Sequence, residues 1–209
     1  MYSKFLFDLD GVLVDTTNIQ INSTIEAIHC IYENIINDNI TNNIISSTIT
    51  TKNKLKKLCE LKLIKNEDIE KINKLKKHIA NEHFNNLKPD YEKIELFKYL
   101  KENNCKIGIV TNSNKKSSTI ILKKIGIYDF IDLHISNEDV ENTKPHSEPY
   151  IKAICNFGGV LKDYIIFEDS ETGLISARGT GVRVQEVLNY KDINLDNILE
   201  LIYNINANE

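Results

Sequence analysis

A short apolar segment that ends in two aspartates, one residue apart, constrains the fold of this chain most strongly. Phe5, Leu6 and Phe7 would be apolar on both sides of an extended chain, which predicts a short strand buried on both faces. Asp8 and Asp10 follow, and the strand must end there because a sheet interior would leave both carboxylates unneutralised. Carboxylates this close indicate a cation between them, and hard oxygen ligands favour Mg²⁺. The simpler interpretation is a strand followed by an acidic turn.

Residues 16–88 have a helical pattern with no strand signal. Apolar residues recur at intervals of three and four in three stretches, as they do in amphipathic helices, and Thr16 or Thr17 would cap the first. These residues are Ile21, Ile25, Ile28, Tyr32 and Ile35 in the first stretch, Leu55, Leu58 and Leu61 in the second, and Ile69, Ile72, Leu75, Ile79 and Phe84 in the third. The polar segment 37–53 contains isoleucines, which favour an ordered irregular loop over disorder.

Beyond Pro89 the pattern changes to strands that alternate with helices, and Gly126 is a natural end for one of these helices. The predicted strands are residues 106–110, 131–135, 164–167 and 182–187, and the predicted helices lie near 94–100, 120–124, 149–157 and 174–178. This alternation implies right-handed crossovers and a parallel sheet covered on both faces. We therefore predict an α/β core of residues 1–15 and 89–209, interrupted by an all-helical domain of residues 16–88.

The charge balance argues against a nucleic-acid partner. The chain carries 26 basic and 30 acidic residues and a formal net charge of −4, so no polyanion-binding surface is indicated. Arg178 and Arg183 are the only arginines. A bound phosphate would therefore meet lysine and backbone N–H groups rather than bidentate arginine.

Cysteine use and hydropathy favour a cytoplasmic protein. The cysteines are widely spaced without a C-x-x-C pair, which is typical of reduced core residues: Cys30, Cys59, Cys105 and Cys155. No signal peptide precedes Phe5, and no apolar run approaches the ~20 residues of a membrane span. We expect a cytoplasmic protein without membrane contact, as a monomer or a weak dimer.

Polar residues follow each predicted strand, where an open α/β sheet binds its ligands. Besides Asp8 and Asp10, they are Thr111, Asn112 and Ser113 after the second strand, Lys144 in the loop after the third, and Glu168 and Asp169 after the fourth. One hydroxyl, one lysine and several carboxylates would thus meet at one edge of the sheet.

Each of these groups also has a structural interpretation when it is taken alone. Residues 111–114 would serve equally well to cap the next helix. Lys144 before Pro145 resembles a solvated loop lysine, and Glu168 and Asp169 would favour a helix N-terminus electrostatically. Together, these interpretations require separate polar clusters to fall at strand ends by chance.

The order of these groups resembles the haloacid dehalogenase-like hydrolase superfamily over nearly the whole chain. The segment Asp8-Leu-Asp10-Gly-Val-Leu-Val-Asp15 is specific for it, and the later motifs follow in order. The resemblance is to members with a helical cap after the first motif, such as phosphoglycolate phosphatases and β-phosphoglucomutase-like proteins. It implies a Rossmann-like parallel sheet core with an inserted all-helical cap domain.

The resemblance also implies the chemistry of a phosphatase for a small phosphorylated metabolite. Asp8 would attack phosphorus to form an aspartyl-phosphate, and Asp10 would protonate the leaving group and then activate water. The implied Mg²⁺ ligands are Asp8, the Asp10 backbone carbonyl, Asp169 and Glu168, the last directly or through water. The implied phosphate contacts are Gly11, Thr111, Asn112 and Lys144, of which Thr111 and Lys144 also belong to the catalytic set.

Other activities of the same superfamily remain as alternatives. Asp10 argues against dehalogenases, which lack the second aspartate. Mutases carry a histidine where Gln20 stands and an arginine in the cap, whereas residues 16–88 contain no arginine. Phosphonatases use a cap lysine as a Schiff base, and no surrounding pattern singles out Lys52 or Lys54. A non-catalytic binding protein on this fold is a further alternative. We expect the polar loop 46–54 to contact the substrate, or else to be a solvated connection.

Overall fold

A computed structural model of the chain describes residues 2–32, 39–47 and 51–208. The chain divides into two compact units. One unit, called the core unit below, consists of Met1–Asp15 and Leu87–Glu209, and the other, called the helical unit, consists of Thr16–Asn86. The chain therefore leaves the core unit after its first strand and returns to it once.

The core unit is built on a five-stranded sheet in which all neighbouring strands are parallel, in the order β3-β2-β1-β4-β5. The strands are β1 (Lys4–Phe7), β2 (Lys106–Val110), β3 (Leu133–Ile135), β4 (Tyr164–Glu168) and β5 (Arg183–Glu186). This confirms the predicted α/β class and parallel sheet. The third strand begins two residues later than predicted, because the Asp132 side chain accepts a hydrogen bond from the Ile107 N–H at 2.8 Å.

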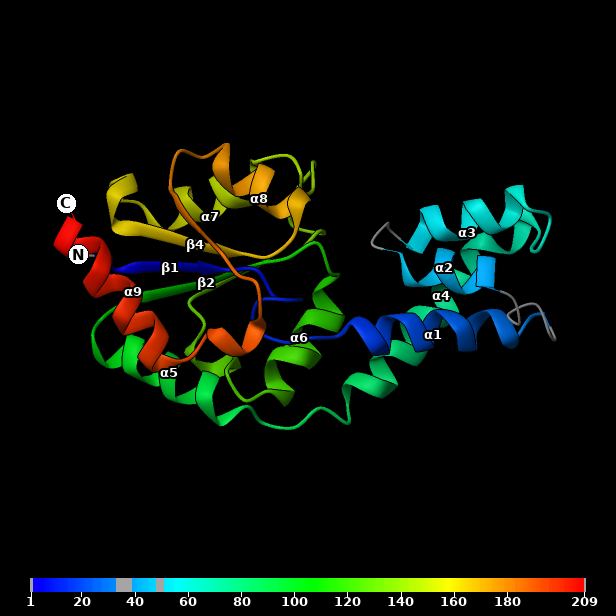
Figure 1. The fold of residues 1–209 in the computed structure, drawn as a ribbon, viewed down its shortest axis with the longest axis horizontal. Helices are drawn as coiled ribbons and strands as arrows, with labels where there is room; N and C mark the ends of the chain where they lie inside the picture. Colours follow the sequence, from blue (N-terminus) through cyan, green and yellow to red (C-terminus); the bar gives the residue numbers. More distant parts are fainter. Residues whose placement is uncertain (1, 33–38, 48–50, 209) are drawn as a thin grey trace. The chain divides into compact units, whose positions relative to one another are not determined.

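Helices cover both faces of the sheet (Figure 1). On one side lie α7 (Glu148–Phe157) and α8 (Glu171–Arg178), and on the other lie α5 (Tyr91–Glu102), α6 (Lys115–Lys124) and α9 (Leu195–Asn208). The sequence pattern predicted the first four of these helices but not α9. Within the described residues, no helix combines the length and the apolar character that crossing a bilayer requires.

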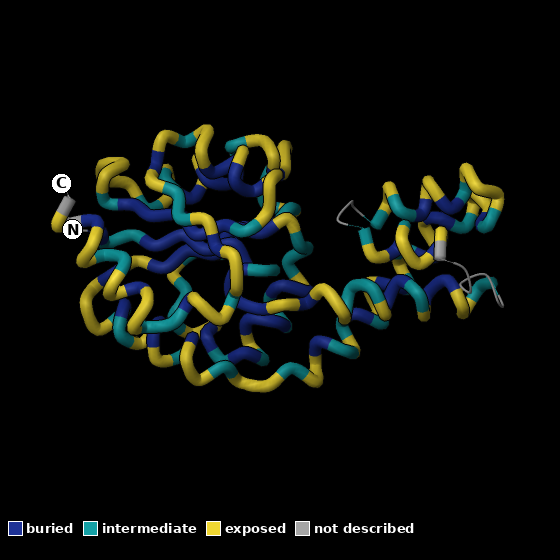
Figure 2. Tube along the Cα trace, viewed as in Figure 1, coloured by how far each residue is buried: buried dark blue, intermediate teal, exposed yellow. Residues whose placement is uncertain are grey.

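β1 is buried along most of its length (Figure 2), and apolar side chains pack on both of its faces. Leu6 packs into a buried cluster with Tyr150 and Ala153 of α7. On the opposite face, the Phe7 ring stacks on Phe167 of β4 at a centroid distance of 4.8 Å and contacts Phe97 of α5 at 5.3 Å. Side chains alternate along a strand, so the apolar run of residues 5–7 can bury both faces in this way. The carboxyl end of β1 is thus fixed by the packing on both sides of it.

The predicted end of the helix at Gly126 is confirmed. Gly126 has φ +86°, its N–H donates to the Lys123 carbonyl, and the Ile127 N–H donates to the Leu122 carbonyl. These two bonds close the last turn of α6 in a Schellman motif, which needs a left-handed residue.

In its described residues, the helical unit contains α1 (Thr17–His29), α2 (Asn39–Ser46), α3 (Thr51–Glu60), the short 3-10 turn Asn66–Asp68 and α4 (Ile69–Phe84). The three helices predicted from apolar spacing are confirmed as α1, α3 and α4, and Thr16 occupies the N-cap position of α1 without a side-chain cap bond.

The prediction of an irregular loop at 37–53 is wrong where the structure describes it, because α2 occupies most of it. Ile45 is fully buried in one apolar cluster with Leu55 and Leu58 of α3, and tertiary burial outweighs the weak helix propensity of Asn, Thr and Ile. Residues 37–38 and 48–50 lie outside the described part of the chain. The expected substrate loop 46–54 therefore consists partly of α3 and partly of residues that are not described.

Candidate active site

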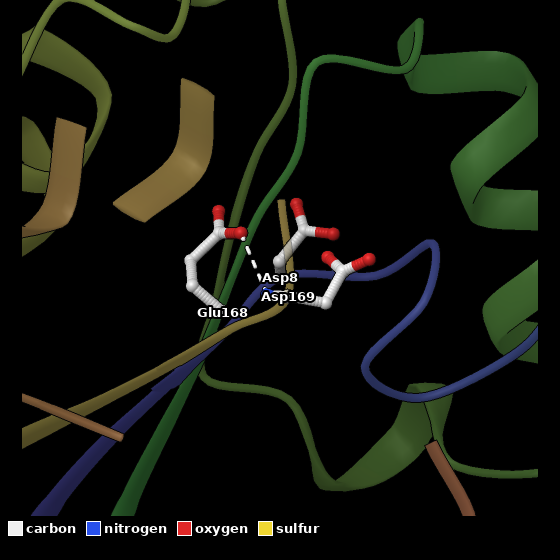
Figure 3. A group of neighbouring side chains, drawn as sticks. All are labelled: Asp8, Glu168 and Asp169. Atoms are coloured by element: carbon white, nitrogen blue, oxygen red, sulfur yellow. Dashed lines mark hydrogen bonds between the residues drawn. The ribbon is translucent and has the colours of Figure 1, made fainter. Parts of the chain in front are cut away.

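Three acidic side chains meet where β1 and β4 end (Figure 3). The parallel pair β1–β4 continues one step past β1, because the Asp8 N–H donates to the Phe167 carbonyl at 3.0 Å. Asp8, Glu168 and Asp169 each offer a carboxylate oxygen, and these oxygens lie within 4.8 Å of one another. The strand pairing thus brings together residues that are 160 positions apart in sequence.

Lys144 places one positive charge among these carboxylates. Its Nζ donates to Asp8 Oδ1 at 2.6 Å and also to Glu168 Oε1, and the lysine and glutamate side chains are 3% and 0% exposed. Burial alone would lower the pKa of Lys144, but the charges of Asp8 and Glu168 outweigh this effect and raise it. Lys144 therefore remains protonated and directs its positive charge at Asp8 and Glu168.

Tyr150 completes the buried network around Glu168. Its hydroxyl donates to Glu168 Oε1 at 2.8 Å and accepts a bond from Lys144 Nζ at 3.1 Å. The other oxygen of Glu168, Oε2, accepts the Asp169 N–H at 3.1 Å. Both oxygens of Glu168 are thus already engaged by the protein, whereas Tyr150 did not figure in the sequence prediction.

Burial makes the remaining negative charge costly. It is the largest cause that raises the pKa of Asp8, and Lys144 opposes this shift. It also raises the pKa of Asp169 to about 6, and the neighbouring Glu168 adds to this rise. Three carboxylates share a single ammonium group, so a bound cation would stabilise the ionised cluster.

The donor set fits Mg²⁺. Asp169 Oδ1 is a buried oxygen without a hydrogen-bond partner, a position that a metal ligand would explain. Gly11 makes room for this carboxylate, since a Cβ built at residue 11 would lie 2.0 Å from Asp169 Oδ2. Buried carboxylate oxygens with nothing softer beside them are the ligands that Mg²⁺ selects.

Gly11 allows the sharp turn that follows β1. Its φ of +92° is one that residues with side chains rarely adopt, and its N–H donates to the Val14 carbonyl at 2.7 Å. This N–H thus stabilises the turn after β1, and the phosphate contact of Gly11 stays a prediction.

The loop after β2 connects the other predicted residues. Thr111 Oγ1 accepts the Ser113 N–H at 3.0 Å, and Ser113 Oγ donates to Asp10 Oδ2 at 2.9 Å. The Asn112 side chain pairs with the backbone of Lys144 through two bonds, of 3.1 and 3.0 Å. The loop thus holds Asp10 and Lys144, which come from two other loops.

Gly173 lets α8 pack closely against Glu168. A Cβ at this position of α8 would lie 2.0 Å from Glu168 Oε2. The helix therefore approaches the buried carboxylate more closely than any side chain would allow.

Most of the predicted site residues lie in one network. Asp8, Lys144, Glu168 and Asp169 are in direct contact or share the acidic cluster. Asp10, Thr111 and Asn112 are joined to this group through hydrogen bonds of the loop after β2. Sequence reasoning missed Tyr150 and the contact of Ser113. The signals for them were a tyrosine on the buried face of α7, and a hydroxyl two residues after the strand-ending threonine.

Comparisons with known proteins agree with this arrangement. A family model described as haloacid dehalogenase-like hydrolase matches residues 5–187. Among curated proteins, pyrophosphatase PpaX of Bacillus cereus (strain AH820) is 26% identical over 183 residues, which cover 87% of this chain and 81% of that protein.

Solved structures share the fold. A predicted phosphoglycolate phosphatase from Haemophilus somnus 129PT aligns with a TM-score of 0.77 at 18% identity, covering 96% of this chain and 98% of that one. A β-phosphoglucomutase from Clostridium difficile aligns with a TM-score of 0.72 at 20% identity, covering 98% and 100%. At these identities the likeness extends to the fold alone.

Proposed function

The chain belongs to the haloacid dehalogenase-like hydrolase family and is a phosphatase, and we propose that it uses Mg²⁺ to hydrolyse a small phosphorylated metabolite through an aspartyl-phosphate on Asp8. One observation carries the proposal. The Asp8 carboxylate lies at a strand end, is paired with the ammonium group of Lys144, and shares an acidic cluster with Asp169, which has a buried oxygen without a hydrogen-bond partner. This arrangement suits a nucleophile that must approach a phosphate dianion.

In the first half-reaction, an oxygen of Asp8 forms a bond to phosphorus while the bond to the leaving oxygen breaks. Asp10 gives its proton to that oxygen, and the alcohol departs. In the second half-reaction, Asp10 takes a proton from water, whose oxygen attacks phosphorus. The bond to Asp8 breaks, inorganic phosphate leaves and the enzyme is restored.

Charge neutralisation is divided between the lysine and the metal. Lys144, paired with Asp8 Oδ1 at 2.6 Å, offsets the repulsion between the carboxylate and the phosphate. The Thr111 hydroxyl and the Asn112 N–H would bind phosphate oxygens. Mg²⁺, held by Asp8, Asp169 and the Asp10 backbone carbonyl, supplies further charge stabilisation when bound. We assign Glu168 to holding Lys144, because both of its oxygens accept hydrogen bonds from the protein.

A phosphomutase is the alternative within the family, and two features disfavour it. Gln20 stands where mutases carry a histidine, and its amide oxygen accepts a bond from Lys76 of α4. An amide does not titrate, so it cannot support an acid–base switch. In addition, residues 16–88 offer no arginine for a second phosphate group.

Inorganic pyrophosphate is a second candidate substrate, because curated relatives at 26% identity are named pyrophosphatases. Pyrophosphate carries the same reacting phosphoryl group with a phosphate as its leaving group. The proposed residues would act on it without change.

We further propose that the helical unit is the cap domain that recognises the rest of the substrate. The sequence from 16 to 86 contains ten lysines and eight acidic residues, whereas the remainder of the chain is acidic in balance. An excess of lysines in the unit that binds an anionic substrate would attract that substrate electrostatically. A role for residues 46–54 in specificity stays a prediction.

The proposal is tested with a panel of phosphate esters and pyrophosphate, by measuring the release of inorganic phosphate with Mg²⁺ and after chelation by EDTA. We expect turnover with Mg²⁺ that EDTA abolishes and Mg²⁺ restores. Efficient isomerisation of a sugar phosphate with little phosphate release would instead identify a mutase. Binding of phosphorylated compounds without any turnover would identify a non-catalytic protein.

A further inference from the structure

Ser113 is a polar residue whose hydroxyl contacts one of the proposed catalytic groups. Its Oγ donates to Asp10 Oδ2 at 2.9 Å, across 103 positions of sequence. We propose that Ser113 is the positioning residue that orients Asp10 for proton transfer, an inference that rests on the proposed function.

The backbone of Ser113 is fixed on both sides, so its hydroxyl starts from a defined place. The Ser113 N–H donates to Thr111 Oγ1 at 3.0 Å, and the Ser113 carbonyl accepts the Asn137 N–H at 3.2 Å. Asn114, the next residue, caps α6 by accepting the Ser117 N–H at 2.9 Å. The backbone that carries the hydroxyl is therefore held by the residue after β2, by the N-cap of α6 and by the loop after β3, and it does not need to be ordered when substrate binds.

The hydrogen bond distinguishes the two oxygens of Asp10. With Oδ2 accepting from Ser113, the carboxyl group of Asp10 is held in one orientation while it transfers its proton. Negative charge builds up on the carboxylate as this proton moves to the leaving oxygen, and a donor already directed at the carboxylate becomes a charge-assisted bond. Ser113 keeps its own proton throughout, so it contributes orientation and charge stabilisation rather than a chemical step.

A purely structural role makes a different prediction. If the bond only joined two loops, its loss would lower the activity toward all substrates alike. If the bond acts through Asp10, its loss matters in proportion to how much the leaving oxygen needs a proton. Leaving-group dependence therefore separates the two roles.

The test compares kcat/KM of wild type and Ser113→Ala for an alkyl phosphate and for para-nitrophenyl phosphate, both with Mg²⁺. An alkoxide needs protonation as it leaves, whereas para-nitrophenolate is stable without it. We expect a loss of about ten- to a hundredfold for the alkyl ester, in the range of a hydrogen bond to a charged group, and of about twofold or less for the aryl ester. Ser113→Thr, which keeps a hydroxyl, should restore most of the alkyl activity.

Ser118→Ala is the matched control. Ser118 lies near the start of α6 and is buried, and its Oγ bonds to the Asn114 carbonyl and to His134 Nε2, each at 2.9 Å, without contact to Asp10. Its loss should lower the melting temperature at least as much as Ser113→Ala does, while the ratio of alkyl to aryl activity stays at the wild-type value. Both melting curves show whether the variants fold.

Each outcome decides between the ideas. Equal losses for the two esters in Ser113→Ala, with wild type active, would overturn the positioning role and leave the phosphatase intact. A wild type that hydrolyses neither ester would overturn the proposed function itself. In an Asp10→Ala background, Ser113→Ala should cost nothing further on phenyl phosphate, since residues that act as one unit are not additive.

Discussion

At the scale of single residues, Tyr150 is the buried side chain that most directly supports the proposed ion pair. Tyr150→Phe removes the hydroxyl that donates to Glu168 Oε1 at 2.8 Å and keeps the ring in the core. The buried glutamate then loses one of its donors, so we expect the free energy of unfolding to fall by about 1–3 kcal/mol. We also expect a lower kcat, because Lys144 loses a contact that places it beside Asp8. Denaturant unfolding and steady-state kinetics measure the two effects.

Tyr164→Phe is the control for this prediction. The Tyr164 hydroxyl donates to the Ile154 carbonyl at 3.1 Å and to the Gly158 carbonyl. Tyr164 is the first residue of β4, whereas the site lies where β4 ends. This variant should lose a similar amount of stability and keep its kcat. If both variants lose stability and both keep kcat, Tyr150 supports the fold and not the site.

The sequence allowed the prediction of residues that stand directly at strand ends. Asp8, Thr111, Glu168 and Asp169 could be found in this way, because parallel strands bring their carboxyl ends to one edge. Tyr150 and the contact of Ser113 could not, because their roles depend on partners 18 and 103 positions away. Periodicity marks a tyrosine on a helix face only as buried, and it does not show which carboxylate its hydroxyl reaches.

At the scale of elements, α8 can pack closely against the end of β4 because Gly173 has no side chain. In an exposed helix, Gly→Ala would stabilise by ~1 kcal/mol. Here the new Cβ would lie 2.0 Å from Glu168 Oε2 and 2.1 Å from its Cδ, so the carboxylate must move away from Lys144. We therefore expect Gly173→Ala to destabilise by roughly 2–4 kcal/mol and to lower activity, since overpacking and a disturbed buried ion pair act together. Denaturant unfolding measures whether the free energy of unfolding falls or rises in this variant.

Thr172→Ala tests the same helix without the close approach, because Thr172 is the exposed neighbour on α8. It should change stability by a few tenths of a kcal/mol at most, in the direction of helix propensity. A Gly173→Ala variant that is more stable than wild type would contradict the account of this helix.

Elements with a regular apolar period or a terminating glycine could be predicted, whereas segments that mix polar and apolar residues without a clear period could not. α4 and β2 follow their apolar patterns, and the end of α6 follows from Gly126. The segment that contains α2 was predicted as an ordered irregular loop because it is polar and contains isoleucines. The burial of Ile45 against α3 shows why a helix forms there instead. Local propensity decides such a segment less than tertiary contacts do.

At the scale of the whole molecule, a chain of 209 residues combines a core unit that carries the proposed chemistry with a helical unit inserted after its first strand. The core unit could be predicted in class and in most of its elements, because its apolar strands alternate with helical patterns along the chain. The substrate could not, because the helical unit departs from the residues that identify mutases and phosphonatases. The substrate panel described above is therefore the experiment that identifies the substrate.

The central claim, that Asp8 is the nucleophile, is tested most directly by trapping the enzyme during turnover. Wild type and Asp8→Asn are each mixed with Mg²⁺ and a substrate that the wild type hydrolyses. The mixtures are quenched in acid and digested for peptide mass spectrometry. We expect a phosphoryl group on the peptide that contains Asp8 in wild type, its absence in Asp8→Asn, and a loss of turnover by several orders of magnitude in a variant that still folds. Rapid hydrolysis by a folded Asp8→Asn variant, or a phosphoryl group trapped on another residue, would contradict the account.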